Sequence, residues 1–246
     1  MTEVAEGVHR LGDRYVNWYV IEDGSRLTVL DAGFPAHWPQ LPALLGTIGK
    51  TLADIDALLL THTHADHLGS AERVRREAGA RVLVHEAEAA DARGHGRSPS
   101  PIGVVAALVR PFFFRYIIHI VRAGGLKIET IAEVAAFRDG ERLDVPGAPR
   151  VIHAPGHTPG TCALHVEARD VLFSGDALVT LDTATGYVGP SLLTPPFVEK
   201  LDGALDALAR VEATGAGTVL PGHGEPWRDG VAAAVAHARR RAVKER

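Results

Sequence analysis

The sequence has very little cysteine: Cys162 is the only one among its 246 residues. A disulfide within the chain is therefore impossible, as is usual for proteins kept in a reducing compartment. The first residues, MTEVAEGVHRLGD, also lack the basic segment and following apolar segment of an export signal. From these two absences we expect a cytoplasmic protein.

The chain also lacks an excess of positive charge, since 26 Lys and Arg stand against 30 Asp and Glu and give a net charge of −4. Nucleic-acid binders usually present a basic face, so no nucleic-acid partner is expected. An apolar stretch at 101–125 is interrupted by Arg110, Pro111, Arg115 and His119. Such interruptions make a poor transmembrane helix, so we expect no stable membrane insertion.

The length fits one large α/β domain covering residues 1–246, and no linker separates two halves. Runs of β-type residues alternate with segments that have apolar residues at helical spacing. We expect helices near 41–48, 66–79, 197–213 and 230–246, and strands at 15–22, 26–33, 55–62, 81–86, 142–146, 150–156, 161–176 and 218–224.

Histidine is the residue in excess, with 13 in the chain, and the stretch THTHADH explains part of this number. It places His62, His64, Asp66 and His67 within six residues, directly after an apolar run typical of a buried strand. A short loop between two rigid elements can turn these side chains toward one point. Imidazole and carboxylate suit zinc, iron or manganese, and a single cysteine excludes a thiolate-rich site.

Three later loops each carry one further ligand type after an expected strand: His157 in APGHTPG, Asp176 in FSGDAL and His223 in LPGHGEP. The neighbouring glycines let the backbone turn sharply and give a ligand room to approach. Seven potential ligands are too many for one tetrahedral ion. Two ions that share a bridging carboxylate would use all of them.

The motifs THTHADH, PGHTPG, SGD and PGHG, in this order and after LDAG at Leu30–Gly33, resemble the metallo-β-lactamase superfamily. The resemblance extends from about Val8 to Gly224 and implies a four-layer αββα sandwich with the metals at one rim of the two sheets. It implies that Asp31 supports the site from outside the ligands. It also implies one ion at His62, His64 and His157, a second at Asp66, His67 and His223, and Asp176 bridging both.

The chemistry expected of this site is hydrolysis, with two divalent ions, zinc in preference to iron or manganese. A water shared by two such ions has its pKa lowered toward neutrality, and the resulting hydroxide attacks an electron-poor carbonyl or phosphorus. Asp66 and Asp176 are the candidate catalytic residues: both offset the metal charge and orient the water, and Asp66 is the better candidate to pass a proton to the leaving group.

Among the superfamily's branches, the sequence is most similar to the glyoxalase II-like and lactonase-like group. His64 stands where the diiron flavoproteins typically have Glu, and only a short tail follows PGHG, whereas glyoxalase II proper carries a helical glutathione domain. Val179 replaces a Tyr of many lactonases. We therefore expect a small ester, thioester or lactone as substrate. Alternatives are a mononuclear iron enzyme resembling persulfide dioxygenases, or a catalytically weak ligand-binding protein of the same fold.

An apolar insertion at about 97–127 lies between the first and second ligand loops. It is interpreted as a lid over the site, a homodimer contact through 101–125, or a membrane-surface element. As a lid, its apolar residues would select acyl or aromatic substrates: Phe112, Phe113, Phe114, Tyr116, Ile117 and Ile118. The remaining histidines are taken as ordinary surface or packed residues (His9, His37, His95, His119, His237) or as structural residues near the site (His85, His153, His165).

Overall fold

The computed structural model describes residues 2–94, 96–98 and 100–244. Within them, the first sheet holds seven strands in chain order, antiparallel from β1 to β4 and parallel from β4 to β7. These strands are β1 (Thr2–Ala5), β2 (Val8–Gly12), β3 (Asn17–Asp23), β4 (Arg26–Leu30), β5 (Ile55–Leu60), β6 (Arg81–His85) and β7 (Ala135–Phe137).

The second sheet has the order β13-β10-β9-β8, in which only the β10–β13 pair is parallel. Strands β8, β10 and β13 therefore point the same way, and their carboxyl ends share one edge. A two-stranded ribbon of β11 and β12 lies beside this sheet. The strands are β8 (Arg150–His153), β9 (Cys162–Val166), β10 (Val171–Gly175), β11 (Val179–Leu181), β12 (Val188–Ser191) and β13 (Thr218–Pro221).

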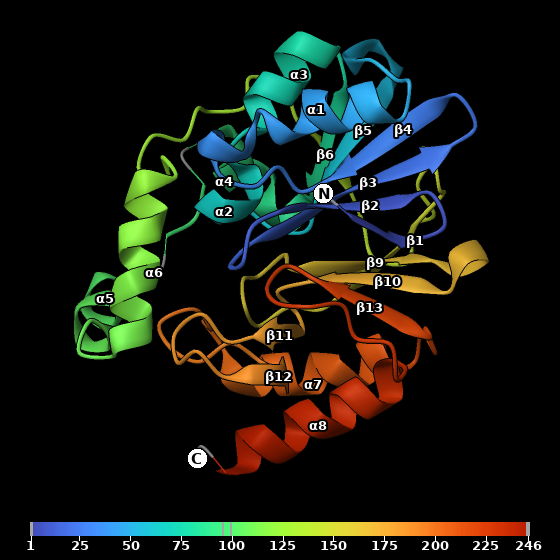
Figure 1. Cartoon of the computed structure of the whole chain (residues 1–246). Helices are drawn as coiled ribbons and strands as arrows, with labels where there is room; N and C mark the ends of the chain where they lie inside the picture. Colours follow the sequence, from blue (N-terminus) through green and yellow to red (C-terminus); the bar gives the residue numbers. More distant parts are fainter. Residues whose placement is uncertain (1, 95, 99, 245–246) are drawn as a thin grey trace.

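Helices cover the outer face of each sheet, so the molecule has four layers (Figure 1). Helices α1 (Gln40–Thr47) and α3 (Ala71–Ala78) cover the first sheet, and α7 (Leu201–Glu212) and α8 (Val231–Lys244) cover the second. The expected αββα sandwich is confirmed. The short elements are α2 (Ala65–Leu68), α4 (Ala89–Arg93) and 3₁₀ turns at Pro35–His37, Leu52–Asp54, Glu86–Glu88 and Glu167–Arg169.

Strand β5 is apolar from Ala57 to Leu60 because both of its faces are buried there. Leu58 and Leu60 pack in the core below the first helical layer, whereas Ala57 and Leu59 pack between the two sheets. Successive side chains of a strand point to opposite faces, which accounts for this division. Burial of a leucine side chain stabilises the fold by roughly 1.5–3 kcal/mol, so β5 is held rigidly where it delivers the first ligand loop.

Three expected elements differ from the structure. The strand expected at 161–176 is two antiparallel strands, β9 and β10, joined by the 3₁₀ turn Glu167–Arg169. The single helix expected at 66–79 is divided into α2 and α3. At the break, a Cβ on Gly69 would lie 2.4 Å from the Gly33 carbonyl oxygen, so the chain passes there too closely for any larger residue. The strand expected at 142–146 is also absent, and one isolated bridge pairs Arg142 with Arg150. The run ends in a turn, with positive φ at Gly147 and Ala148, that leaves no room for a ladder.

Residues 101–122 form two helices outside the four layers, α5 (Pro101–Ala107) and α6 (Pro111–Arg122) (Figure 1). Each begins with proline at its first turn, where the missing N–H costs no hydrogen bond. The two helices pack on one another through Ala107 and Phe113. Among the described residues, no helix is long and apolar enough to span a bilayer.

Candidate metal centre

The seven side chains singled out from the sequence come together at one edge of the two sheets. His62 and His64 lie in the loop after β5, and Asp66 and His67 lie on α2. His157, Asp176 and His223 follow β8, β10 and β13, whose carboxyl ends share this edge. A Cβ on Gly222 would lie 2.3 Å from Asp176 Oδ1, so the glycine before His223 is what allows the two loops to approach.

The side chains form two groups of three, and each group could hold one cation. His62, His64 and His157 form one group, and Asp66, His67 and His223 form the other. In the first group, the Nε2 atoms of His62 and His157 are 3.0 Å apart. Two ring nitrogens at this distance cannot both be protonated, because their N–H groups would point at each other. Two unprotonated nitrogens, in contrast, can direct their lone pairs at one bound cation.

Asp176 lies between the two groups. Its Oδ1 is 3.5 Å from His67 Nε2, and its Oδ2 is 3.4 Å from His157 Nε2 and 3.1 Å from His223 Nε2. One carboxylate therefore faces histidines of both groups. This is the arrangement of a ligand that bridges two ions.

The burial of the seven side chains, and two of their atoms that lack a hydrogen-bond partner, also fit a bound cation. All seven side chains are buried. Within the described part of the chain, His67 Nε2 and Asp176 Oδ1 are buried and have no hydrogen-bond partner, although they face each other at 3.5 Å. Buried polar atoms are rarely left without a partner. A metal ion between them would satisfy both, so the donor set fits.

The field of the carboxylates favours positive charge beside His67. Burial alone would lower the pKa of His67, but the carboxylates of Asp176, Asp31 and Asp66 outweigh it and raise this pKa to about 10. Burial instead lowers the pKa of His157 to about 3 and keeps the pKa of His62 well below its usual value. The first group is therefore neutral, as metal-ligating imidazoles must be, and the second attracts a cation.

Asp31 supports the site from behind the ligands. It has φ 58°, a left-handed conformation that aspartate tolerates better than most residues. Its Oδ1 accepts the Thr61 N–H at 2.8 Å, and its Oδ2 lies 2.8 Å from His67 Nδ1. A carboxylate can only accept, so the His67 Nδ1 carries the proton and the Nε2 faces the cluster.

Glu88 is a supporting residue that the sequence reasoning missed. It is fully buried after β6, and its Oε2 accepts the N–H of Thr63 at 3.1 Å and the Thr63 hydroxyl. Its Oε1 accepts the N–H of Gly160 at 2.8 Å. Thr63 lies between His62 and His64, and Gly160 lies in the His157 loop. One carboxylate therefore connects the two loops that supply the first group.

Tyr116, on α6, contacts the cluster of seven side chains directly. Its hydroxyl donates to Asp66 Oδ2 at 2.8 Å, and its ring lies across that of His223. Burial, with the neighbouring Asp66 carboxylate, raises the pKa of this phenol well above its usual value, so it stays a donor. The sequence suggested Tyr116 only as part of an apolar wall.

A pocket of about 390 Å³ lies over the cluster and is mostly apolar. Its lining includes His64, Asp66, His157, Asp176 and His223 below and Tyr116, Ile117 and Ile120 above. Of the six residues expected to form the apolar wall, Tyr116 and Ile117 line this pocket. The others do not: Phe112 lines a separate cavity, Phe113 is buried against α5, Phe114 is half exposed and Ile118 is not part of the lining.

His37 and His119, taken as ordinary histidines, flank Asp13 in a third cluster. Asp13 Oδ2 lies 3.2 Å from His37 Nε2 and 2.8 Å from His119 Nε2. The Phe34 N–H donates to His37 Nδ1 at 3.2 Å, so the His37 proton is on Nε2 and is directed at Asp13. The cluster is therefore a joint between α6 and the turn after β2, formed by the His37–Asp13 hydrogen bond and by a close contact of His119 with Asp13 that is not a hydrogen bond.

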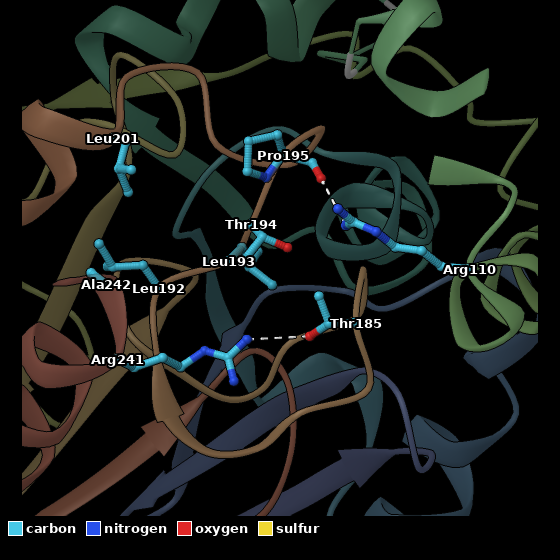
Figure 2. A pocket seen from close by; sticks show the side chains of 9 residues that line it. All are labelled: Arg110, Thr185, Leu192, Leu193, Thr194, Pro195, Leu201, Arg241 and Ala242. Atoms are coloured by element: carbon cyan, nitrogen blue, oxygen red, sulfur yellow. Dashed lines mark hydrogen bonds between the residues drawn. The ribbon is translucent and has the colours of Figure 1, made fainter. Parts of the chain in front are cut away.

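A second cavity, of about 380 Å³, lies apart from the seven side chains and near the end of α8. Figure 2 shows Arg110 donating to the Pro195 carbonyl and Arg241 donating to the Thr185 hydroxyl across this cavity. Leu193 lines both cavities. The buried Asp182 pairs with Arg241, so much of its charge is compensated.

Comparisons with known proteins agree with the geometry. Residues 11–223 match the family model of the metallo-beta-lactamase superfamily. A probable metallo-hydrolase of Bacillus subtilis, YflN, is 27% identical over 241 residues, which cover 91% of this chain and 86% of the relative. The human acyl-coenzyme A thioesterase MBLAC2 is 27% identical over 199 residues, which cover 71% of this chain and 62% of the relative. A crystal structure of a metallo-beta-lactamase family protein from Thermus thermophilus superimposes with a TM-score of 0.68 and 27% identity, covering 96% of this chain and 79% of the other.

Proposed function

This chain belongs to the metallo-β-lactamase superfamily and is a metal-dependent hydrolase; from this premise we propose that it uses two divalent ions, zinc in preference to iron or manganese, to hydrolyse a small ester, thioester or lactone with an apolar acyl part. The observation that carries the proposal is the convergence of seven buried ligands in two groups around Asp176. A mononuclear iron enzyme resembling persulfide dioxygenases shares these motifs, so the number and identity of the bound ions distinguish the two candidates.

In this proposal, His62, His64 and His157 hold one ion, and Asp66, His67 and His223 hold the other, with Asp176 shared. When bound, such a pair of ions would polarise the substrate carbonyl and lower the pKa of a water between them.

The chain's own residues orient the reacting groups. Tyr116 holds Asp66 Oδ2 through a 2.8 Å hydrogen bond and so fixes the plane of that carboxylate. Asp66 is then positioned to pass a proton to the leaving group, and Asp176 offsets the positive charge at the centre. The Nδ1 of His223 donates to the Tyr15 carbonyl at 2.6 Å, and the Nδ1 of His67 donates to Asp31 Oδ2 at 2.8 Å. These contacts set both imidazoles before substrate arrives.

The lining of the pocket over the cluster favours a substrate with an apolar acyl or aryl group. Its walls above the cluster come from Ile117, Ile120, Leu193 and Phe197. Apolar walls with a few convergent polar groups are typical of small-molecule sites. The thioesterase name of the human relative supports a thioester among the three substrate classes.

The test is elemental analysis of the purified protein, followed by hydrolysis assays with thioesters, lactones, β-lactams and phosphodiesters. We expect two metal ions per chain and turnover of a thioester or lactone. His62→Ala should lose metal and activity, whereas His237→Ala, on α8 and away from the cluster, should keep both. One iron per chain with oxygen uptake on a persulfide would overturn the dinuclear assignment in favour of the iron enzyme.

A further inference from the structure

The α5–α6 segment exposes an unusual amount of apolar surface. Nine large apolar side chains are exposed among the described residues, and seven of them lie between residues 102 and 126. Val109 is 84% exposed and Leu126 is 75% exposed. Helices α5 and α6 pack together through Val104, Ala107 and Phe113, and α6 packs on the sandwich through Tyr116 and Ile120, which leaves the remaining faces of both helices exposed. The seven are Ile102, Val105, Leu108, Val109, Phe114, Val121 and Leu126.

The same segment is cationic in a chain that is acidic overall. Residues 92–128 contain six Arg and Lys and no Asp or Glu, whereas the whole chain has a net charge of −4. Among the described residues, four of these cations are exposed and form no salt bridge: Arg110, Arg115, Arg122 and Lys127. An apolar face flanked by unpaired cations is typical of helices that lie in the headgroup region of an anionic bilayer.

The charge pattern argues against a second copy of this chain on the same face. In a symmetric dimer, the same patch of both subunits would be in contact. The four cations of one copy would then face those of the other, with no carboxylate in the segment to pair with them. A partner surface of opposite charge that also accepts apolar side chains satisfies both features.

The metal pocket opens at this apolar surface. Val121 is 52% exposed and also lines the pocket, as does the exposed Leu126. Their chain neighbours Ile120 and Gly125 line the pocket as well. An acyl chain held in a bilayer against this surface would therefore meet a continuous apolar path to the cluster.

We propose that the exposed face of α5 and α6, with Leu126 and Lys127, docks on an anionic lipid bilayer and receives acyl substrates from it. The proposal rests on the proposed function for the identity of the substrate but not for the docking itself. Figure 1 shows that the segment lies outside the four layers, so docking requires no change in the sandwich. Binding at a surface also differs from insertion, for which no helix of the described residues is long enough.

The test is co-sedimentation of the full chain with vesicles of phosphatidylcholine alone or with about a quarter phosphatidylglycerol. We expect binding to the anionic vesicles, weaker binding to the neutral ones, and loss of binding at high salt. The double variant Arg115→Glu/Arg122→Glu and the double variant Val109→Asp/Phe114→Asp should each bind at least about tenfold more weakly. The matched controls Arg240→Glu and Val188→Asp, at exposed positions outside the segment, should bind as the parent does.

Sedimentation that is absent, or that is unchanged in both double variants, would overturn the proposal. So would a dimer in lipid-free solution that either double variant dissociates, because the surface would then be an interface between copies. Hydrolysis is measured separately with a soluble short-chain thioester. The double variant Val109→Asp/Phe114→Asp should hydrolyse this substrate at the same rate as the parent. Lack of turnover by the parent would refute the proposed function on this substrate while leaving the sedimentation result to decide the docking.

Discussion

Glu88 offers the sharpest check of how the site is built, because one buried carboxylate connects two ligand loops. Glu88→Ala removes the acceptor of the Thr63 N–H, of the Thr63 hydroxyl and of the Gly160 N–H. The hydroxyl can rotate to another acceptor, but the two N–H groups are fixed by the backbone. A buried donor without a partner costs about 1–3 kcal/mol, so the free energy of unfolding should fall by about 2–6 kcal/mol.

The same variant should weaken metal binding, because His62, His64 and His157 lose their common support. Outer contacts of this kind typically contribute about 10–100-fold to metal affinity. Glu88→Gln retains one carbonyl oxygen and can accept from only one of the two loops, so it should fall between Glu88→Ala and the parent. The assays are urea unfolding of the metal-free protein and zinc affinity by competition with a chromophoric chelator.

The matched control is Glu86→Gln, two residues earlier. Glu86 is exposed and pairs with Arg138 at the surface, and exposed pairs contribute about 1 kcal/mol or less. If Glu88→Ala unfolds like this control and binds zinc within about twofold of the parent, Glu88 supports neither loop.

Three further predictions test the metal, α6 and its joint. Zinc at about 100 times its Kd should stabilise the chain by about 2.7 kcal/mol, raising Tm by about 5–10 °C in a thermal-shift assay; a chelator should reverse the rise, and no rise would contradict a built site. Tyr116→Phe removes the donor to Asp66 and should lower kcat/KM by about tenfold with little change in metal content; an unchanged rate would exclude the orienting role. Burial raises the pKa of Asp13, but the hydrogen bonds from His37, Tyr15 and Val16, with the charge of His119, outweigh it and lower this pKa to about 2. This pKa is below the usual 3.8, so the carboxylate stabilises the fold above about pH 4 and the effect is lost between about pH 4 and 2. Asp13→Asn should therefore lower Tm near neutral pH and match the parent near pH 2, and an equal loss at both would refute the assignment.

The sequence alone was enough for the fold class and for the seven side chains of the cluster. Four of these side chains lie together in THTHADH after β5, and the other three lie in glycine-containing loops after β8, β10 and β13, so their positions depend on local signals that the sequence displays. Which strand ends meet was implied by the resemblance of the ordered motifs to the metallo-β-lactamase superfamily. The same resemblance indicated Asp31, because LDAG at the end of β4 matches the first motif of that family.

The tertiary structure decided the contacts between distant segments. Glu88 is 72 residues from Gly160, and Tyr116 is 50 residues from Asp66. Nothing around Glu88 in the sequence distinguishes it from the exposed Glu86, because burial depends on which loops fold over it. The apolar wall was expected to use six neighbouring residues, but a helix turns each successive side chain by about 100°. Only the packing of α6 on the sandwich could show that Tyr116 and Ile117 face the pocket while Phe114 faces outward.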